Sequence, residues 1–153
     1  MDTKAELVVF RVDQQRYALP LLSVERIVRA AEVTRLPNAP ANVIGVVDVT
    51  GRIIPVLDIR RRFRHEPKTI TPMDHFVIAQ TSRRDVILVV DEALGVITGD
   101  EATAHGVDEV DQIQGAITLD DGMLLIQDLE KFLTAEDEVV LDQALNEGTS
   151  NAA

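Results

Sequence analysis

Two aspartates at repeated positions are the residues whose type and spacing could do chemistry. Asp58 and Asp128 each follow an apolar run and precede a short stretch with helical character. Two carboxylates brought together could work as a paired acid and base. A carboxylate in that position also suits a helix N-cap, since its oxygen accepts a hydrogen bond from a free amide of the first turn. We therefore expect both aspartates to be caps and not catalytic groups.

Asp48 offers a second route to catalysis. Asp48-Val49-Thr50-Gly51 resembles the Asp-Thr-Gly of aspartic proteases, in which two carboxylates share a proton. Here a valine separates the aspartate from Thr-Gly, and a second copy of the segment has Thr118 at the matching place. An aspartate-dependent hydrolase stays an alternative that this pattern disfavours.

The other polar residues predict neither a metal site nor a cofactor site. His65, His75 and His105 lie in or beside loops without a partner at metal-binding spacing, so we expect solvated side chains. The acidic stretch 108–111 lacks the residue order of a calcium loop. Phosphate-binding glycine loops, dinucleotide fingerprints and nucleophile elbows do not occur. The sequence predicts a protein that is not an enzyme and holds no cofactor.

Charge and composition narrow the classes of partner. The 153 residues are 46% hydrophobic and carry a formal net charge of −11, which argues against nucleic acid as a partner. Without cysteine and without an apolar run of about 18 residues, we expect a cytoplasmic protein with no direct membrane insertion. A basic cluster, Arg60-Arg61-Arg62 with Arg64, could dock an acidic partner or cover a helix face.

A central hairpin would position these residues. Two β-branched apolar runs, Val43–Val49 and Arg52–Ile59, meet at Thr50-Gly51, where glycine permits the positive φ of a tight turn. Both faces of the runs are apolar, so both must be covered. Pro55 cannot donate to a ladder, which indicates an edge, a bulge or a strand that leaves one sheet for another. The hairpin therefore predicts a join between two sheets.

The elements around this hairpin follow from periodicity and turn residues. The segment from Leu21 to Val28 has helical spacing but could equally lead into a strand. We expect hairpins at Leu7–Leu19 and Phe76–Val90, a loop at 64–74, a helix at Ala135–Leu145 and a disordered tail at 146–153.

The second half of the chain repeats the first at a separation of about seventy residues. The alignment places Gly45 on Gly115, Thr50-Gly51 on Asp121-Gly122, Asp58 on Asp128 and Phe63 on Phe132. The repeat predicts two lobes, at about 6–65 and 75–134, with strands exchanged near their join. Each lobe would have about five short strands, a number at which a small sheet commonly closes into a barrel.

Taken together, these segments resemble the CheW-type coupling proteins of bacterial chemotaxis. The resemblance runs from about Glu6 to Leu145 and rests on four motifs. These are Phe10 with Tyr17-Ala18-Leu19-Pro20, Pro37 and Pro40 before Val43-Ile44-Gly45-Val46, the stretch Gly51–Ile59, and Val89-Val90-Asp91-Glu92.

The resemblance implies a fold and a function. The fold would be mainly β, a single CheW-like domain at 6–145 of two interlocked five-stranded SH3-like barrels with short helices and a C-terminal helix. The protein would have no enzymatic activity. It would bridge the cytoplasmic tip of methyl-accepting chemoreceptors and the regulatory domain of a CheA-type histidine autokinase, and so be recruited from the cytoplasm to membrane receptor arrays.

Two sets of contact residues follow from the matching segments. The resemblance implies receptor contacts at Leu21, Val24, Arg26, Phe76 and Val77, and kinase contacts at Gly45, Val46, Thr50, Gly51 and Ile54. Plain core packing is the other interpretation of Val24, Val46, Phe76 and Val77.

Two departures from the family pattern leave open which behaviour of the cell the protein controls. The family's hairpin turn is usually Asn-Leu-Arg-Gly, whereas Thr50 stands here in place of the arginine. Arg26 stands where many relatives carry an acid. An adaptor of a non-chemotaxis array, controlling pili or surface behaviour, is therefore an alternative, as is a structural module of a homo-oligomer.

Overall fold

The computed structural model describes residues 6–98, 113–119 and 122–150, in which ten strands form two five-stranded sheets. The first sheet has the order β8-β1-β2-β10-β9 and the second β3-β6-β7-β5-β4. The strands are β1 Glu6–Val12, β2 Gln15–Pro20, β3 Val24–Arg29, β4 Val43–Val49, β5 Arg52–Leu57, β6 His75–Gln80, β7 Asp85–Val90, β8 Glu92–Thr98, β9 Ile113–Leu119 and β10 Gly122–Gln127. The helical segments are η1 Leu21–Ser23, α1 Ile59–Arg62, η2 Leu129–Lys131 and α3 Ala135–Ser150. The prediction of a mainly β fold is confirmed.

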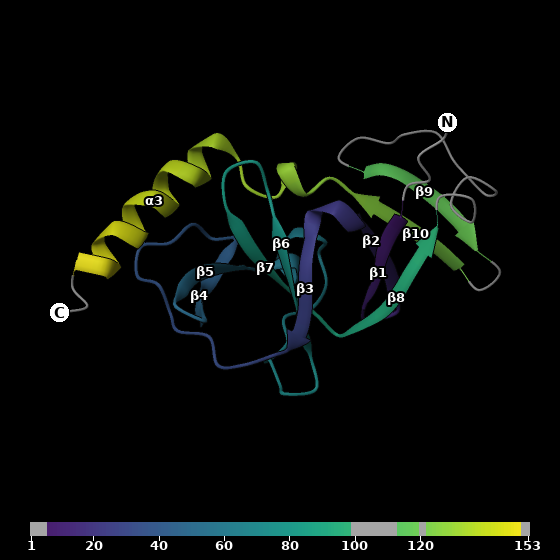
Figure 1. The fold of residues 1–153 in the computed structure, drawn as a ribbon, viewed down its shortest axis with the longest axis horizontal. Helices are drawn as coiled ribbons and strands as arrows, with labels where there is room; N and C mark the ends of the chain where they lie inside the picture. Colours follow the sequence, from purple (N-terminus) through teal and green to yellow (C-terminus); the bar gives the residue numbers. More distant parts are fainter. Residues whose placement is uncertain (1–5, 99–112, 120–121, 151–153) are drawn as a thin grey trace.

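Each sheet draws strands from both halves of the chain (Figure 1). The β1–β2 hairpin pairs with β8 and β10, while the β6–β7 hairpin pairs with β3 and β5. Replacing every strand by its counterpart in the other half converts one strand order into the other. The two hairpins are therefore exchanged between the lobes, and a division of the chain at residues 65–75 cuts across both sheets.

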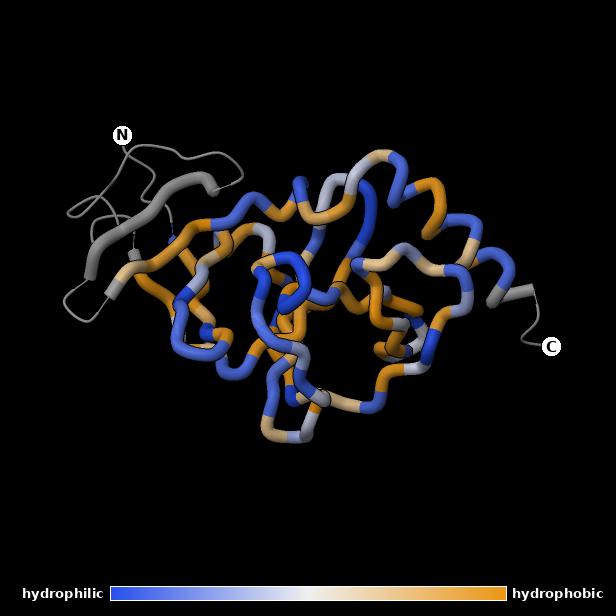
Figure 2. Tube along the Cα trace, turned by 180° about the vertical axis from the view of Figure 1, so that it is seen from behind, coloured by the Kyte–Doolittle hydropathy of each residue, from blue (hydrophilic) through white to orange (hydrophobic). Residues whose placement is uncertain are grey.

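Three apolar clusters account for the stability of this arrangement. Each sheet has its own core, and a larger central core joins them with side chains from both exchanged hairpins, including Phe10, Leu19, Val77 and Leu88. In Figure 2 the hydrophobic residues follow the strands through the middle of the molecule, and the turns are hydrophilic. Burial on both faces explains why the strands at the join are apolar throughout.

Both predicted caps are confirmed. The Asp58 side chain accepts a hydrogen bond from the Arg61 amide at 3.1 Å, and the Asp128 side chain accepts one from the Glu130 amide at 3.0 Å. The sequence left open whether the segment from Leu21 to Val28 is a helix or a strand. In the structure it makes one short helical turn, η1, and continues as strand β3 from Val24. Among the described residues, no helix is long and apolar enough to span a membrane.

The C-terminal helix is longer than predicted. Helix α3 continues to Ser150, so residues 146–150 are helical where a disordered tail was expected, and 151–153 lie outside the described residues. Leu141 and Ala144 are buried, and the Asn38 amide donates to the Glu147 carboxylate at 3.2 Å. These contacts anchor the helix and explain why an acidic, polar stretch stays ordered.

The repeat aligns one residue differently at the hairpin turn. Gly122 is the first residue of β10 and pairs with Leu119, just as Arg52 begins β5 and pairs with Val49. Gly122 therefore corresponds to Arg52, and the predicted match of Thr50-Gly51 with Asp121-Gly122 is wrong by one position.

Candidate functional site

The tip of the β4–β5 hairpin is the most exposed part of the predicted kinase-binding segment. Thr50 and Gly51 have φ values of 48° and 89°, which makes the two-residue connection a type I′ turn. The Asp48 carboxylate accepts a hydrogen bond from the Gly51 amide at 2.8 Å, and the Thr50 hydroxyl donates to the Val49 carbonyl at 2.8 Å. Asp48 therefore holds the turn, which is a structural role.

The predicted kinase contacts divide into surface and core positions. Thr50 and Gly51 are exposed and Val46 is half-buried, whereas Ile54 is 2% exposed and packs in the core of the second sheet. Gly45 is buried, and a Cβ at this position would overlap the carbonyl oxygen of Thr34. Gly45 and Ile54 shape the hairpin but do not present side chains to a partner.

The predicted receptor contacts divide in the same way. Leu21 and Val24 are half-buried and Arg26 is exposed, so these three line one surface segment from η1 into β3. Phe76 and Val77, 1% and 0% exposed, lie inside on β6. They do not present side chains to the surface, because β6 pairs with β3 and its side chains at these positions fill the core. They support the surface from beneath.

Two exposed apolar residues were missed by sequence reasoning. Leu22 is 99% exposed on η1, between Leu21 and Val24, and Ile53 is 54% exposed next to the hairpin tip. Leu22 falls outside the helical spacing that links Leu21 to Val24, and this spacing could have indicated that its side chain is exposed. Ile53 lay in an apolar run whose two faces look alike, so only the three-dimensional structure could distinguish it from Ile54.

An ion-pair cluster connects the two surface segments. The Arg52 guanidinium lies 2.7 Å from a carboxylate oxygen of Glu25 and also pairs with Asp85. Glu25 lies between Val24 and Arg26, and Arg52 follows the hairpin turn directly. The hydrogen bond from Arg52 lowers the pKa of Glu25, because it stabilises the ionised form of this carboxylate.

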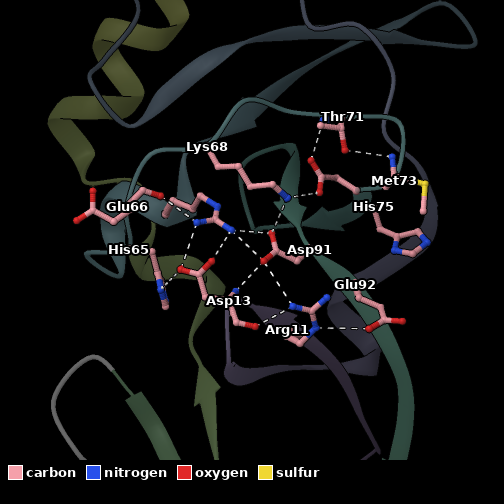
Figure 3. A network of polar contacts seen from close by, with 12 residues as sticks. Arg11, Asp13, His65, Glu66, Lys68, Thr71, Met73, His75, Asp91 and Glu92 are labelled. Carbon is pink, nitrogen blue, oxygen red and sulfur yellow. Dashed lines mark hydrogen bonds and ion pairs between the residues drawn. The ribbon is translucent and has the colours of Figure 1, made fainter.

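A second polar network lies at the join of the two lobes (Figure 3). Asp13, His65, Lys68 and Asp91 converge there, and the Arg60 guanidinium binds Asp13 at 2.9 Å and Asp91 at 2.8 Å. Hydrogen bonding to Arg60 lowers the pKa of Asp13. Burial alone would raise the pKa of Asp91, but its hydrogen bonds with Arg60 and the Asp13 amide lower it overall. Arg60 and the two aspartates therefore form paired charges, which suits a structural lock.

His65 and His75 contact neighbouring groups, where solvated side chains were predicted. The His65 side chain is 17% exposed, and its ring nitrogens lie 2.7 Å from the Tyr17 hydroxyl and 3.0 Å from an Asp13 oxygen. His75 accepts a hydrogen bond from the Ala93 amide at 3.3 Å, while His105 lies outside the described residues. Across the described part of the chain, no three His, Cys, Asp or Glu residues cluster to hold a metal ion.

The basic cluster is largely structural. Arg60 belongs to the lock at the join, and the Arg62 guanidinium lies 4.6 Å from the centre of the Phe132 ring in a cation–π contact. Burial lowers the pKa of Arg62. Arg61 and Arg64 are exposed, so only these two of the four arginines are presented for an acidic partner.

A cavity of about 660 Å³ lies beside α1 and is lined largely by aliphatic side chains, such as Val33, Ile44 and Ile70. Among its charged groups, the Lys68 ammonium lies 3.0 Å from an Asp74 oxygen, and Arg60 pairs with Asp91 as described above. These four groups are engaged with one another, so they suit the packing of the loop at 64–74 better than acid–base chemistry.

Known proteins share this fold. A family model described as the CheW-like domain matches residues 6–137. The chain belongs to the CheW-like family. The resemblance inferred from the sequence is thereby confirmed.

Curated relatives match most of the chain. Chemotaxis protein CheW of Bacillus subtilis is 30% identical over 107 residues, covering 70% of this chain and 69% of the relative. Chemotaxis protein CheW of Klebsiella aerogenes is 25% identical over 143 residues, covering 90% and 86%. Protein FrzA of Myxococcus xanthus is 30% identical over 128 residues, covering 74% and 80%. Family membership is consistent with a scaffold that is not an enzyme.

The fold also matches a solved structure. The crystal structure of the scaffolding protein TtCheW from Thermoanaerobacter tengcongensis superposes with a TM-score of 0.75 at 24% identity, covering 90% of this chain and 92% of that chain. At this identity the likeness concerns the fold, and it is consistent with two interlocked SH3-like barrels in a CheW-like arrangement.

Proposed function

We propose that this CheW-like chain is a non-catalytic adaptor that couples transmembrane chemoreceptors to a CheA-type histidine autokinase in a chemotaxis array. One observation carries the proposal: two adjoining surface segments, the β4–β5 hairpin tip and the η1–β3 segment, each expose an apolar side chain above a rigid core. Exposed apolar groups on a rigid scaffold are typical of protein-binding surfaces. The protein would act in the cytoplasm and be recruited to membrane receptor arrays.

The kinase surface of this proposal centres on the hairpin tip. Thr50 and Gly51 present backbone and hydroxyl groups, Val46 lies half-buried beside them, and Ile53 adds apolar area. Gly45 and Ile54 contribute indirectly, by fixing the path of β4 and the packing of β5. The partner would be the regulatory domain of the kinase.

The receptor surface of this proposal comprises Leu21, Val24 and Arg26 together with Leu22. Leu22 would be its anchor, because burying a fully exposed leucine against a partner contributes the most binding free energy, about 1.5–3 kcal/mol on complete burial. Phe76 and Val77 hold the segment in place from the core. The partner would be the cytoplasmic tip of a methyl-accepting chemoreceptor.

A second function, as an adaptor of a non-chemotaxis array, fits the same surfaces. The relative named Protein FrzA does not carry the chemotaxis name that the other two relatives share. Together with Thr50 and Arg26, which depart from the family pattern, this supports an adaptor of a non-chemotaxis array as the alternative. A hydrolase at Asp48 finds no such support, because its carboxylate is engaged by the Gly51 amide.

The test is an affinity capture from the native cell lysate with matched baits. Wild-type protein is compared with Thr50→Glu at the hairpin tip, with Leu22→Glu on η1, and with Thr69→Glu, the same kind of change at an exposed loop residue. Bound proteins are identified by mass spectrometry. Thr50→Glu is expected to lose a histidine kinase, Leu22→Glu to lose a receptor, and Thr69→Glu to retain both.

Two results would contradict the proposal. Folded wild-type bait that recovers neither a kinase nor a receptor would limit the resemblance to the fold. Equal recovery by all four baits would place the contacts elsewhere on the surface. The class of receptor and kinase recovered also separates the chemotaxis output from another array.

A further inference from the structure

The cavity beside α1 has the size and the lining of a small-molecule site. Its volume of about 660 Å³ lies within the usual range of such sites, about 300–1,000 Å³. Four aliphatic side chains of its lining pack against the core of the second sheet but are only half-buried, namely Val33, Ile44, Ile70 and Val89. The core of this sheet is therefore open to a ligand on the side of the cavity.

Backbone hydrogen bonds fix one wall of the cavity. The Ala30 amide donates to the Asp74 carbonyl at 2.9 Å, and Thr34 exchanges two hydrogen bonds with Val46, at 2.7 and 2.9 Å. Between these two points, residues 31–33 all line the cavity. The small side chain of Ala30, which also lines it, leaves space between the wall and the core.

The loop at 64–74 forms the other wall, and the buried Asp74 holds it. The Asp74 carboxylate accepts hydrogen bonds from the Thr71 amide at 2.8 Å and from the Lys68 ammonium at 3.0 Å. Pro67 and Pro72, both in the lining, restrict the backbone of the loop. The two walls are thus fixed before any ligand binds, which lowers the entropic cost of binding.

The charges of the lining do not balance. Two of its four carboxylates are paired with its two cations, as described above. The other two, Glu32 and Asp58, form no ion pair within the described part of the chain. Asp58 is half-buried and uses one oxygen to cap α1, whereas Glu32 is exposed. Surplus negative charge beside an apolar surface favours a ligand that combines a positive charge with an apolar body.

An anionic ligand suits the cavity less well. The Lys68 ammonium is already bound by Asp74 and lies 3.6 Å from Asp91. The hydrogen bond with Asp74 raises the pKa of Lys68, because it stabilises the charged ammonium. An anion would have to compete with Asp74 for this cation, and it would be repelled by Glu32.

We propose that this cavity binds a small aliphatic cation, an alkyl group that carries one ammonium. The alkyl group lies against the half-buried side chains Val33, Ile44 and Val89, and the ammonium stays at the exposed edge beside Glu32. Apolar surface is then removed from water while the charge is paired and partly hydrated. Among the described residues, the lining shares none with the proposed receptor and kinase surfaces, so this site does not depend on the proposed function.

The test titrates the full chain with hexylammonium by calorimetry and by NMR. The neutral 1-hexanol and the anionic hexanoate are the matched ligands, since they have the same chain length. Wild type is compared with Glu32→Gln, which removes the charge, and with Ala30→Leu and Ala31→Leu, which fill the cavity. Glu66→Gln, at an exposed glutamate of the same loop outside the lining, is the control. Urea unfolding midpoints establish that each variant is folded.

Wild type is expected to bind one hexylammonium, with nuclear Overhauser contacts to the methyl groups of Val33, Ile44 and Val89. Each methylene added between butylammonium and hexylammonium should tighten binding about 4-fold. Hexanol and hexanoate should bind at least about 2- to 5-fold more weakly, as expected for the loss of an exposed ion pair.

The variants separate the charge from the cavity. Glu32→Gln should weaken hexylammonium about 2- to 5-fold and leave hexanol unchanged. Ala30→Leu and Ala31→Leu should weaken both ligands about 5-fold or more, because the added side chain occupies the cavity. Glu66→Gln should behave as wild type.

Three results would overturn the proposal. The first is the absence of saturable hexylammonium binding up to about 10 mM. The second is equal affinity for hexylammonium, hexanol and hexanoate, because the charge would then select nothing. The third is unchanged binding in a folded cavity-filling variant, which would place the ligand elsewhere. If Ala30→Leu fails to fold, Ala31→Leu makes the same test at an exposed residue.

Discussion

Arg60 binds both carboxylate oxygens of Asp91, with its Nη2 2.8 Å from Oδ1 and 2.9 Å from Oδ2, and the same atom lies 2.9 Å from Asp13. Asp13 belongs to the turn of the exchanged β1–β2 hairpin, whereas Arg60 is on α1, which follows β5 of the other lobe. The guanidinium therefore fastens an exchanged hairpin to the lobe that it reaches.

The other exchanged hairpin is fastened from the corresponding place. Glu130 follows Asp128 by two residues, as Arg60 follows Asp58. Its carboxylate accepts hydrogen bonds from the Ser82 amide at 2.8 Å and the Ser82 hydroxyl at 2.7 Å, in the turn of the β6–β7 hairpin. The equivalent residues Arg60 and Glu130 therefore each bind the turn of an exchanged hairpin, with side chains of opposite charge.

Removing the first lock should destabilise the fold. We expect Arg60→Met to lower the free energy of unfolding by about 2–3 kcal/mol, because Asp91, only 12% exposed, would lose its charge-assisted hydrogen bonds. The matched control is Arg61→Met, an exposed neighbour, with an expected change within about 0.5 kcal/mol. Urea unfolding measures the stability of both variants. An Arg60→Met midpoint equal to that of wild type would show that the lock contributes nothing to stability.

The same lock should give an acid-dependent stability. The folded-state pKa values of Asp13 and Asp91 lie below their ordinary values. Their stabilisation is complete above the unfolded pKa of about 3.9 and is lost as the pH falls through the folded values. Wild type should therefore lose its advantage over Arg60→Met between about pH 5 and pH 2. A gap between the two that stays constant over this range would contradict the assignment.

Local signals in the sequence predicted much of this fold. Glycine at a turn and an aspartate before a short helix each have a local physical cause, and the structure confirms the hairpins and caps that they indicate. The length of α3 could not be predicted in this way. Its last residues depend on contacts with Asn38 and the central core, which are distant in sequence.

The candidate site was harder to predict, for a related reason. In β5, Ile53 and Ile54 are neighbours of the same type, yet one is 54% and the other 2% exposed. Phe76 and Val77 have the composition of a binding surface as well as of a core. Sequence could place these residues in strands, but their exposure depends on which sheet covers which face, and the exchange of hairpins decides that.

Two glycines of the hairpin should respond differently to alanine. Gly45→Ala should cost about 1–3 kcal/mol or more, since the added Cβ meets the Thr34 carbonyl oxygen of an adjacent backbone. Gly51→Ala should cost about 1 kcal/mol, because nothing lies near its Cβ position and only its φ of 89° is unfavourable. Urea unfolding measures both. Loss of kinase binding in Gly45→Ala would then reflect a loss of folding. Loss of kinase binding in Gly51→Ala at a near-native midpoint would instead reflect a lost contact with the kinase. An equal loss of stability in the two variants would contradict the packing described for Gly45.

Tyr17 allows a direct optical test of the join between the lobes. It is 4% exposed, its ring stacks on Phe63 at 4.2 Å, and its hydroxyl lies 2.7 Å from His65. Burial, with a smaller contribution from the charge of Asp13, raises its pKa to about 12. Since the chain has one tyrosine and no tryptophan, its near-ultraviolet phenolate absorbance reports this residue alone.

We expect this titration to have a midpoint near 12 in the folded protein and about 10 in denaturant, where the phenol is solvated. Because the folded value is raised, Tyr17 stabilises the fold fully below about pH 10, and this contribution is lost as the pH rises toward the folded pKa. Tyr17→Phe should abolish the optical signal and flatten the alkaline loss of stability. A folded-state midpoint near 10 would mean that Tyr17 is open to water and that the lobes do not close over it.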